Sequence, residues 1–139
     1  MQLRPRVLVV EGDVTDENLT RRAITSSGID CEVQVAHDGV EACQILFDSG
    51  DPPPSLVLVA LRLPKLSGFE VLTRIRSHPD AKRLTVVAFS RSDDQADVDK
   101  WFELCGNSYV HKDKNFDLFE TKLKLVLYYW IAVNRNVNT

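Results

Sequence analysis

The stretch LVLVALRLPKLSGFEVL, residues 56–72, decides how this chain folds. Its first part, Leu56 to Ala60, is a short continuous apolar run, which is typical of a strand buried on both faces of a parallel sheet. A polar loop follows, and Ser67 then precedes Glu70 by three positions, which is the spacing of a helix-capping box. The stretch therefore predicts a buried strand that leads through a short loop into a helix.

Further strand candidates lie on both sides of this stretch. Val7 to Val10 and Thr85 to Phe89 are buried-type apolar runs, and weaker candidates lie at residues 31–36 and 108–110. Together with residues 56–60 they give five strands, each followed by a helical pattern. This strict alternation predicts an α/β fold of the doubly wound class, with a parallel sheet covered by helices on both faces.

Capping residues mark where several of the helices begin. Asp38 precedes Glu41 by three positions, and Ser92 precedes Gln95 by the same spacing, so helices are expected to start near both. Asp13 is expected to cap the first helix, whose N-terminal amides need an acceptor. The last helix is predicted to be long, extending over about residues 115–134.

Length and composition are those of an ordinary globular protein. The 139 residues are 44% hydrophobic and 27% charged, so we expect a single domain over residues 1–139 that needs no disulfides. The net charge of −3 does not favour nucleic acid as a partner, and no DNA-binding output domain is expected. Three cysteines without C-x-x-C spacing predict buried free thiols in a reducing cytoplasm. We expect no signal peptide, membrane span or membrane partner.

Polar and small residues follow the predicted strands at their carboxyl ends. Residues 11–13 follow the first strand, Ala60 ends the third, Ser90 ends the fourth, and the fifth ends at His111 and Lys112. In doubly wound folds these ends meet at one edge of the sheet, where binding and reaction sites lie. The predicted pocket consists of Glu11, Gly12, Asp13, Ala60, Ser90 and Lys112.

Three segments of the chain resemble the response regulator receiver family. They are residues 7–11, 61–72 and 109–112, and the L-x-L-P-K-x-x-G-x-E-V-L pattern of the second is the most distinctive. The resemblance extends from about Arg6 to Trp130. It implies a flavodoxin-like three-layer (βα)5 sandwich whose five parallel strands have the order 2-1-3-4-5.

Finer details are similar to one branch of this family, the short single-domain regulators that accompany phytochrome-type sensor kinases. These details are the DGVEA sequence at 38–42, the prolines at 52–54 and the pair Tyr129-Trp130. The resemblance implies a sensor histidine kinase or a phosphotransfer protein as the partner.

Receivers transfer a phosphoryl group to a carboxylate at the end of the third strand, with Mg²⁺ held by acids after the first strand. On this resemblance Glu11 matches the first acid, Ala60 the acceptor, Ser90 a hydroxyl that contacts the phosphoryl group, and Lys112 a lysine with the same task. Gly12 falls where a second, metal-binding aspartate is expected.

The departures from the family pattern predict a pocket that has lost its chemistry. Ala60 offers no nucleophile, and Mg²⁺ binding by Glu11 and Asp13 alone is expected to be weak or absent. Asp113 also replaces the proline that commonly follows the lysine. We therefore expect a pseudo-receiver that is not an enzyme, holds no cofactor, pairs Glu11 with Lys112 and acts through protein contacts.

Two alternatives remain open. The first is a conventional phosphorylated regulator, if Ala60 is an engineered change or if Asp13 accepts the phosphoryl group instead. The second is a flavodoxin-like small-molecule binder, for example a flavin carrier. Against it, residues 11–15 lack the hydroxyl-rich phosphate cradle that such proteins use.

The last helix is apolar around more of its circumference than one buried face requires. Its expected core stripe consists of Phe116, Phe119, Leu123, Val126, Leu127 and Trp130. The other apolar and aromatic side chains predict a two-fold homodimer through this helix and its neighbours. The candidate interface residues are Trp101, Phe102, Tyr109, Leu118, Leu125, Tyr128, Tyr129 and Ala132.

Overall fold

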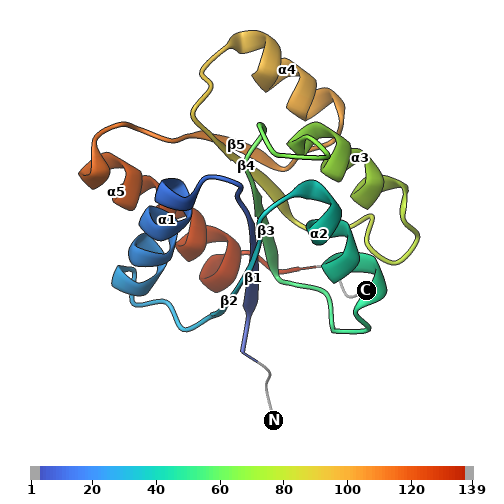
Figure 1. Ribbon diagram of the computed structural model, residues 1–139. Helices are drawn as coiled ribbons and strands as arrows, with labels where there is room; N and C mark the ends of the chain where they lie inside the picture. The colour runs from blue at the N-terminus through green and yellow to red at the C-terminus, as the bar shows by residue number, and fades with distance from the viewer. Residues whose placement is uncertain (1–3, 137–139) are drawn as a thin grey trace.

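Five parallel strands form one sheet in the order β2-β1-β3-β4-β5, as the sequence predicted (Figure 1). The computed structural model describes residues 4–136. The strands are β1 (Arg6–Val10), β2 (Glu32–Ala36), β3 (Leu56–Val59), β4 (Val86–Ser90) and β5 (Ser108–His111). The helices are α1 (Val14–Ser26), α2 (Gly39–Cys43), α3 (Gly68–Ser77), α4 (Gln95–Glu103) and α5 (Phe116–Leu127). Two π-helical turns, η1 (Gln44–Asp48) and η2 (Tyr128–Val133), extend α2 and α5.

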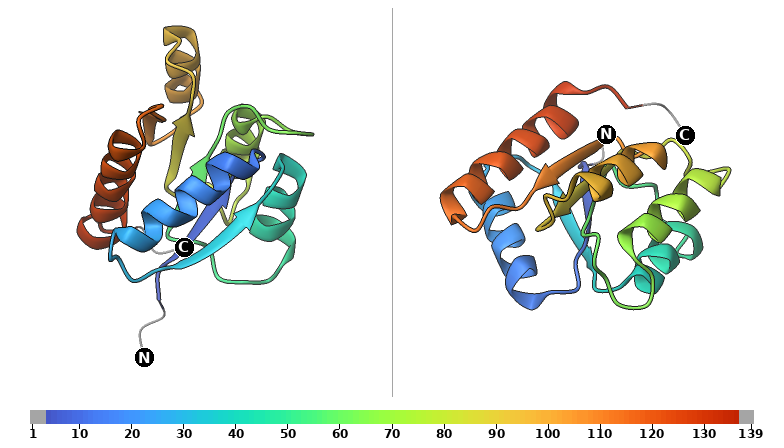
Figure 2. Two further views of the ribbon diagram at one scale, coloured as in Figure 1. Left: turned by 60° about the vertical axis from the view of Figure 1, so that its left-hand side comes forward. Right: turned by 90° about the horizontal axis from the view of Figure 1, so that it is seen from above.

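The helices cover both faces of the sheet and make three layers (Figure 2). Helices α1 and α5 pack on one face, where Phe119, Leu123 and Leu127 of α5 are fully buried against strand side chains such as Val9. Helices α2, α3 and α4 pack on the other face, against the alternate strand residues such as Val10. Burial on both faces explains why β1, β3 and β4 are continuous apolar runs without polar alternation.

Three of the predicted capping residues begin their helices. The side chain of Asp13 accepts a hydrogen bond from the amide of Asp16, at 2.8 Å. Asp38 and Ser67 cap α2 and α3 by accepting from the amides of the glutamates three residues later. Each cap satisfies an amide that the first turn of a helix leaves without a partner.

The predicted start of α4 at Ser92 is wrong, and the cap is Asp94. The carboxylate of Asp94 accepts from the amide of Ala96 at 3.0 Å. The hydroxyl of Ser92 donates instead to the carboxylate of Asp97 at 2.6 Å. The strand before this loop ends at Ser90 as predicted, and Lys112 continues the pairing by donating its amide to the Ser90 carbonyl.

The three cysteines are free thiols: Cys31 is buried, Cys43 is half-buried and Cys105 is exposed, so the prediction of buried thiols is wrong for Cys105, which lies in the turn after α4. Burial raises the pKa of the Cys31 and Cys43 thiols, so both are protonated at neutral pH. Among residues 4–136 no helix has the length and apolar character needed to cross a membrane.

Candidate functional site

The carboxyl ends of the strands bring four of the predicted pocket residues together. Glu11, Ala60, Ser90 and Lys112 are all buried, with exposed fractions of 5%, 7%, 4% and 3%. Glu11, Ala60 and Lys112 directly follow β1, β3 and β5, and Ser90 is the last residue of β4. These four strands lie side by side in the sheet, in the order β1-β3-β4-β5. Gly12 and Asp13 lie at the solvent-exposed rim.

Lys112 is the centre of the buried charges. Its ammonium group donates to Oε1 of Glu11, which confirms the pairing predicted from the sequence. The same ammonium group donates to Oδ2 of Asp16 at 3.1 Å. A buried cation that loses its hydration needs such partners, and here two carboxylates provide them.

Asp16 was not predicted as a pocket residue. It lies in the first turn of α1, only 9% exposed, and Nη2 of Arg91 donates to its Oδ1 at 2.6 Å. The buried residues of α1 are Asp16, Thr20, Ala23 and Ile24. Their helical spacing was visible in the sequence and places Asp16 on the face that points to the core.

The charges around Asp16 determine its protonation. Burial alone raises the pKa of this carboxyl group, but the hydrogen bond from Arg91 and the charge and hydrogen bond of Lys112 outweigh it and lower the pKa below its usual value. Conversely, the hydrogen bond to Asp16 raises the pKa of Arg91. Asp16 is therefore a carboxylate at neutral pH.

The residues after β1 are held by hydrogen bonds and by close packing at the rim of the pocket. Oε2 of Glu11 accepts from the amide of Asp13 at 3.2 Å, while the Asp13 side chain caps α1. A Cβ atom at Gly12 would lie 2.8 Å from Cδ of Pro64, in the loop after β3. Any side chain at position 12 therefore requires this loop to move.

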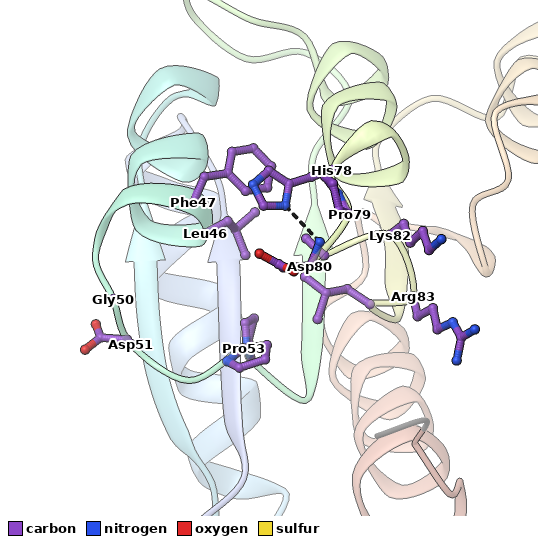
Figure 3. A pocket seen from close by; sticks show the side chains of 13 residues that line it. Leu46, Phe47, Gly50, Asp51, Pro53, His78, Pro79, Asp80, Lys82 and Arg83 are labelled. Carbon is purple, nitrogen blue, oxygen red and sulfur yellow. Dashed lines mark hydrogen bonds between the residues drawn. The ribbon is translucent and has the colours of Figure 1, made fainter. Parts of the chain in front are cut away.

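A further hollow lies at the opposite end of the sheet. It has a volume of about 620 Å³ and lies between the end of η1 and the turn after α3. The rings of Phe47 and His78 stack in its wall, and Nδ1 of His78 accepts from the amide of Asp80 at 3.1 Å (Figure 3). None of the pocket residues predicted from the sequence lines it.

The predicted interface residue Trp101 is not on the surface. Its side chain is fully buried, its ring lies 6.3 Å from that of Phe69, and its Nε1 donates to the carbonyl of Ser108 at 2.8 Å. The assignment of Trp101 to an interface was wrong because the indole is the largest apolar group available to join α4 to the sheet. Tyr109 is half-buried and donates its hydroxyl hydrogen to the carbonyl of Ser92.

The other candidate interface residues are exposed. Leu118, Leu125, Tyr128 and Tyr129 have exposed fractions of 53%, 63%, 59% and 49%, and Phe102 on α4 is 49% exposed. Ala132 is exposed as well. The opposite side of α5 carries the core stripe, so this helix is apolar on two sides.

Comparison with known protein families identifies the family of this chain. The family model for the response regulator receiver domain matches residues 7–124. The chain belongs to this family.

Its relatives among the receivers include regulators of the phytochrome type. The chain is 38% identical over 119 residues to the response regulator Rcp1 of Synechocystis sp., covering 82% of this chain and 81% of Rcp1. The phosphorylated cyanobacterial phytochrome response regulator RcpA has a similar structure, with a TM-score of 0.91 and 29% identity over 98% of this chain and all of RcpA (100%). The Mn²⁺-bound form of Rcp1 gives a TM-score of 0.88 and 31% identity, covering 96% and 99% of the two chains.

Glu11, Ser90 and Lys112 thus bring a buried acid, a buried hydroxyl and a buried lysine to the carboxyl ends of the strands. Ala60, which follows the strand between them, presents only a methyl group. The membership in this family also favours signalling over the flavin-carrier alternative.

Proposed function

We propose that this chain is a response regulator of two-component signalling that is not phosphorylated at position 60 and acts through protein contacts. One observation carries the proposal: the acceptor position is Ala60. A second observation agrees with it, because Lys112 already has two carboxylate partners. An alanine methyl group cannot attack phosphorus. The lysine that would bind a phosphoryl group is neutralised by Glu11 and Asp16 instead.

We also propose that the pocket does not use Mg²⁺, because the residues present do not fit this ion. Glu11 is paired with Lys112, Asp13 caps α1, and Gly12 and Ala60 have no oxygen in their side chains. Mg²⁺ requires near-octahedral oxygen ligands. Within residues 4–136 no group of three or more His, Cys, Asp or Glu side chains is arranged to hold a metal ion.

The proposed partner is a sensor histidine kinase of the phytochrome type or a phosphotransfer protein. The support is the likeness to Rcp1 and to the phytochrome response regulator RcpA. We propose a cytoplasmic location for this contact, because the free thiols of Cys31, Cys43 and Cys105 suit a reducing compartment.

The proposed assembly is a two-fold homodimer through α5. The exposed apolar side chains Leu118 and Leu125 of α5 and Tyr129 of η2 recur at helical spacing on the side away from the core. A helix normally buries one apolar stripe, and a second stripe of this size marks a contact surface. A second copy of the chain has the same surface, so two copies related by a two-fold axis bury these apolar side chains against each other.

Incubation with acetyl phosphate and Mg²⁺, followed by intact-mass measurement, tests the absence of phosphorylation. We expect no stable gain of a phosphoryl group by the full chain. A gain that peptide mapping places on Asp13 or on any other residue would overturn the proposal and favour the conventional regulator.

Sedimentation equilibrium tests the homodimer. We expect the parent chain to be a dimer at micromolar concentration and Leu125→Glu to be a monomer. The matched control is Val14→Glu, which places the same charge on another exposed apolar residue, on α1, and is expected to remain a dimer. A monomeric parent chain, or a dimeric Leu125→Glu variant, would contradict the assignment.

A further inference from the structure

Asp16 joins two cations that belong to different parts of the fold. Its Oδ1 accepts from Nη2 of Arg91, in the loop between β4 and α4, and its Oδ2 accepts from Lys112, after β5. Nε of Arg91 also points to Oδ2, at 3.4 Å. Glu11, by contrast, contacts only one of the two cations. A single carboxylate of α1 therefore bridges the β4–α4 loop and the end of β5.

The bridge is partly shielded from water. The side chain of Asp16 is 12% exposed and that of Lys112 is 3% exposed, whereas the Arg91 side chain is 42% exposed. Hydrogen bonds between charged groups are stronger than neutral ones, and shielding from solvent strengthens them further. The contact is thus more than an exposed ion pair, most of which contribute little.

We propose that Asp16, with its partners Lys112 and Arg91, is a built-in latch. Asp16 supplies the negative charge that the absent acceptor carboxylate and its phosphoryl group would bring to Lys112. Through Arg91 it also holds the β4–α4 loop in one arrangement without covalent modification. This inference rests on the proposed function, in which position 60 is never phosphorylated. It adds the residue that replaces the modification.

The latch reaches the N-terminus of α4 through the same loop. Nη1 of Arg91 donates to the carbonyl of Asp113 at 2.8 Å, which ties the loop to the segment after β5. One residue further, the backbone carbonyl of Ser92 accepts a hydrogen bond from the hydroxyl of Tyr109 at 2.7 Å. The hydroxyl of Ser92 in turn donates to Asp97 of α4. The position of α4, with its exposed face, therefore depends on a loop that Asp16 holds from the other side.

Hydrogen exchange measured by mass spectrometry on the full chain tests the latch. Asp16→Asn keeps the size of the side chain and removes its charge, while Glu17→Gln is the matched control. Glu17 is the next residue of α1 and binds Arg21 and His37 outside the network. The loss of charged hydrogen bonds predicts that amides 90–95 of Asp16→Asn exchange about tenfold faster or more, relative to β1 amides 7–10. For Glu17→Gln we expect a change of less than about twofold.

A second variant keeps the test decisive if Asp16→Asn does not fold. Arg91→Met removes the exposed cation of the bridge and leaves Lys112 with both of its carboxylates. It is expected to accelerate exchange in residues 90–95 about tenfold, because it breaks the link between Asp16 and Arg91 from the other side. Unchanged exchange in Arg91→Met, or equal acceleration in Glu17→Gln, would refute the latch. A phosphoryl gain by the parent chain would instead refute the proposed function.

Discussion

Replacement of Lys112 by methionine tests the charge balance of the pocket most directly. Methionine has a similar unbranched shape, so the variant fills the space of the lysine stem but leaves Glu11 and Asp16 without their common cation. Removal of one partner from a buried ion pair costs roughly 3–5 kcal/mol of unfolding free energy, because a buried charge is left uncompensated. For this chain of 139 residues, an unfolding entropy of about 2.1 cal/mol/K per residue converts that loss into a fall of roughly 10–17 °C in Tm.

The pH dependence of the unfolding free energy distinguishes a lost charge interaction from a simple loss of packing. In the parent chain the pKa of Asp16 is lowered by Arg91 and Lys112 against the opposing effect of burial. Its contribution to stability is thus fully present above the pKa of an unfolded aspartate, about 3.9, and is lost only as the pH falls through the lower folded value. In Lys112→Met, protonation of a carboxylate relieves the uncompensated charge. The difference in unfolding free energy between this variant and the parent therefore becomes smaller as the pH falls from 7.5 to 5.

Urea unfolding of both proteins at pH 7.5 and pH 5 measures the difference. Lys122→Met is the control, because Lys122 pairs with Asp113 at 2.8 Å but is 39% exposed, and such pairs contribute about 0–1 kcal/mol. A loss below about 1 kcal/mol in Lys112→Met, or a gap to the parent that does not narrow at pH 5, would refute the view that Lys112 neutralises two buried carboxylates.

Three further predictions concern the pocket and its supports. Ala60→Asp is expected to gain much less than one phosphoryl group per chain from acetyl phosphate, because Gly12 still provides no metal ligand; brisk labelling by intact mass would contradict this. Asp13→Ala is expected to lose about 1 kcal/mol in urea unfolding, since it removes the α1 cap, and an unchanged midpoint would show that the cap is not needed. Gly106→Ala is expected to lose about 1–3 kcal/mol, because its Cβ would overlap the buried Trp101 ring; a parent-like Tm would show that the ring moves freely.

The local features of the fold were predictable from the sequence because they depend on neighbouring residues. Apolar runs such as Val7 to Val10 predict strands buried on both faces, and Asp13 predicts the start of α1 by offering an acceptor to nearby amides. The start of α4 was missed because two candidate caps compete there. Ser92 is drawn away by Asp97, and only the folded loop shows that Asp94 takes the capping position.

The sequence by itself determined that position 60 has no nucleophile, since that property of Ala60 is covalent and does not depend on folding. Only the tertiary structure decided what the remaining charges do. Asp16 meets Arg91 and Lys112 across 75 and 96 residues of chain, and Trp101 is buried because α4 docks with that side toward β5. Such pairings depend on the order of the strands and on which face of each helix turns inward, and both are set by the burial of the whole core rather than by any local pattern.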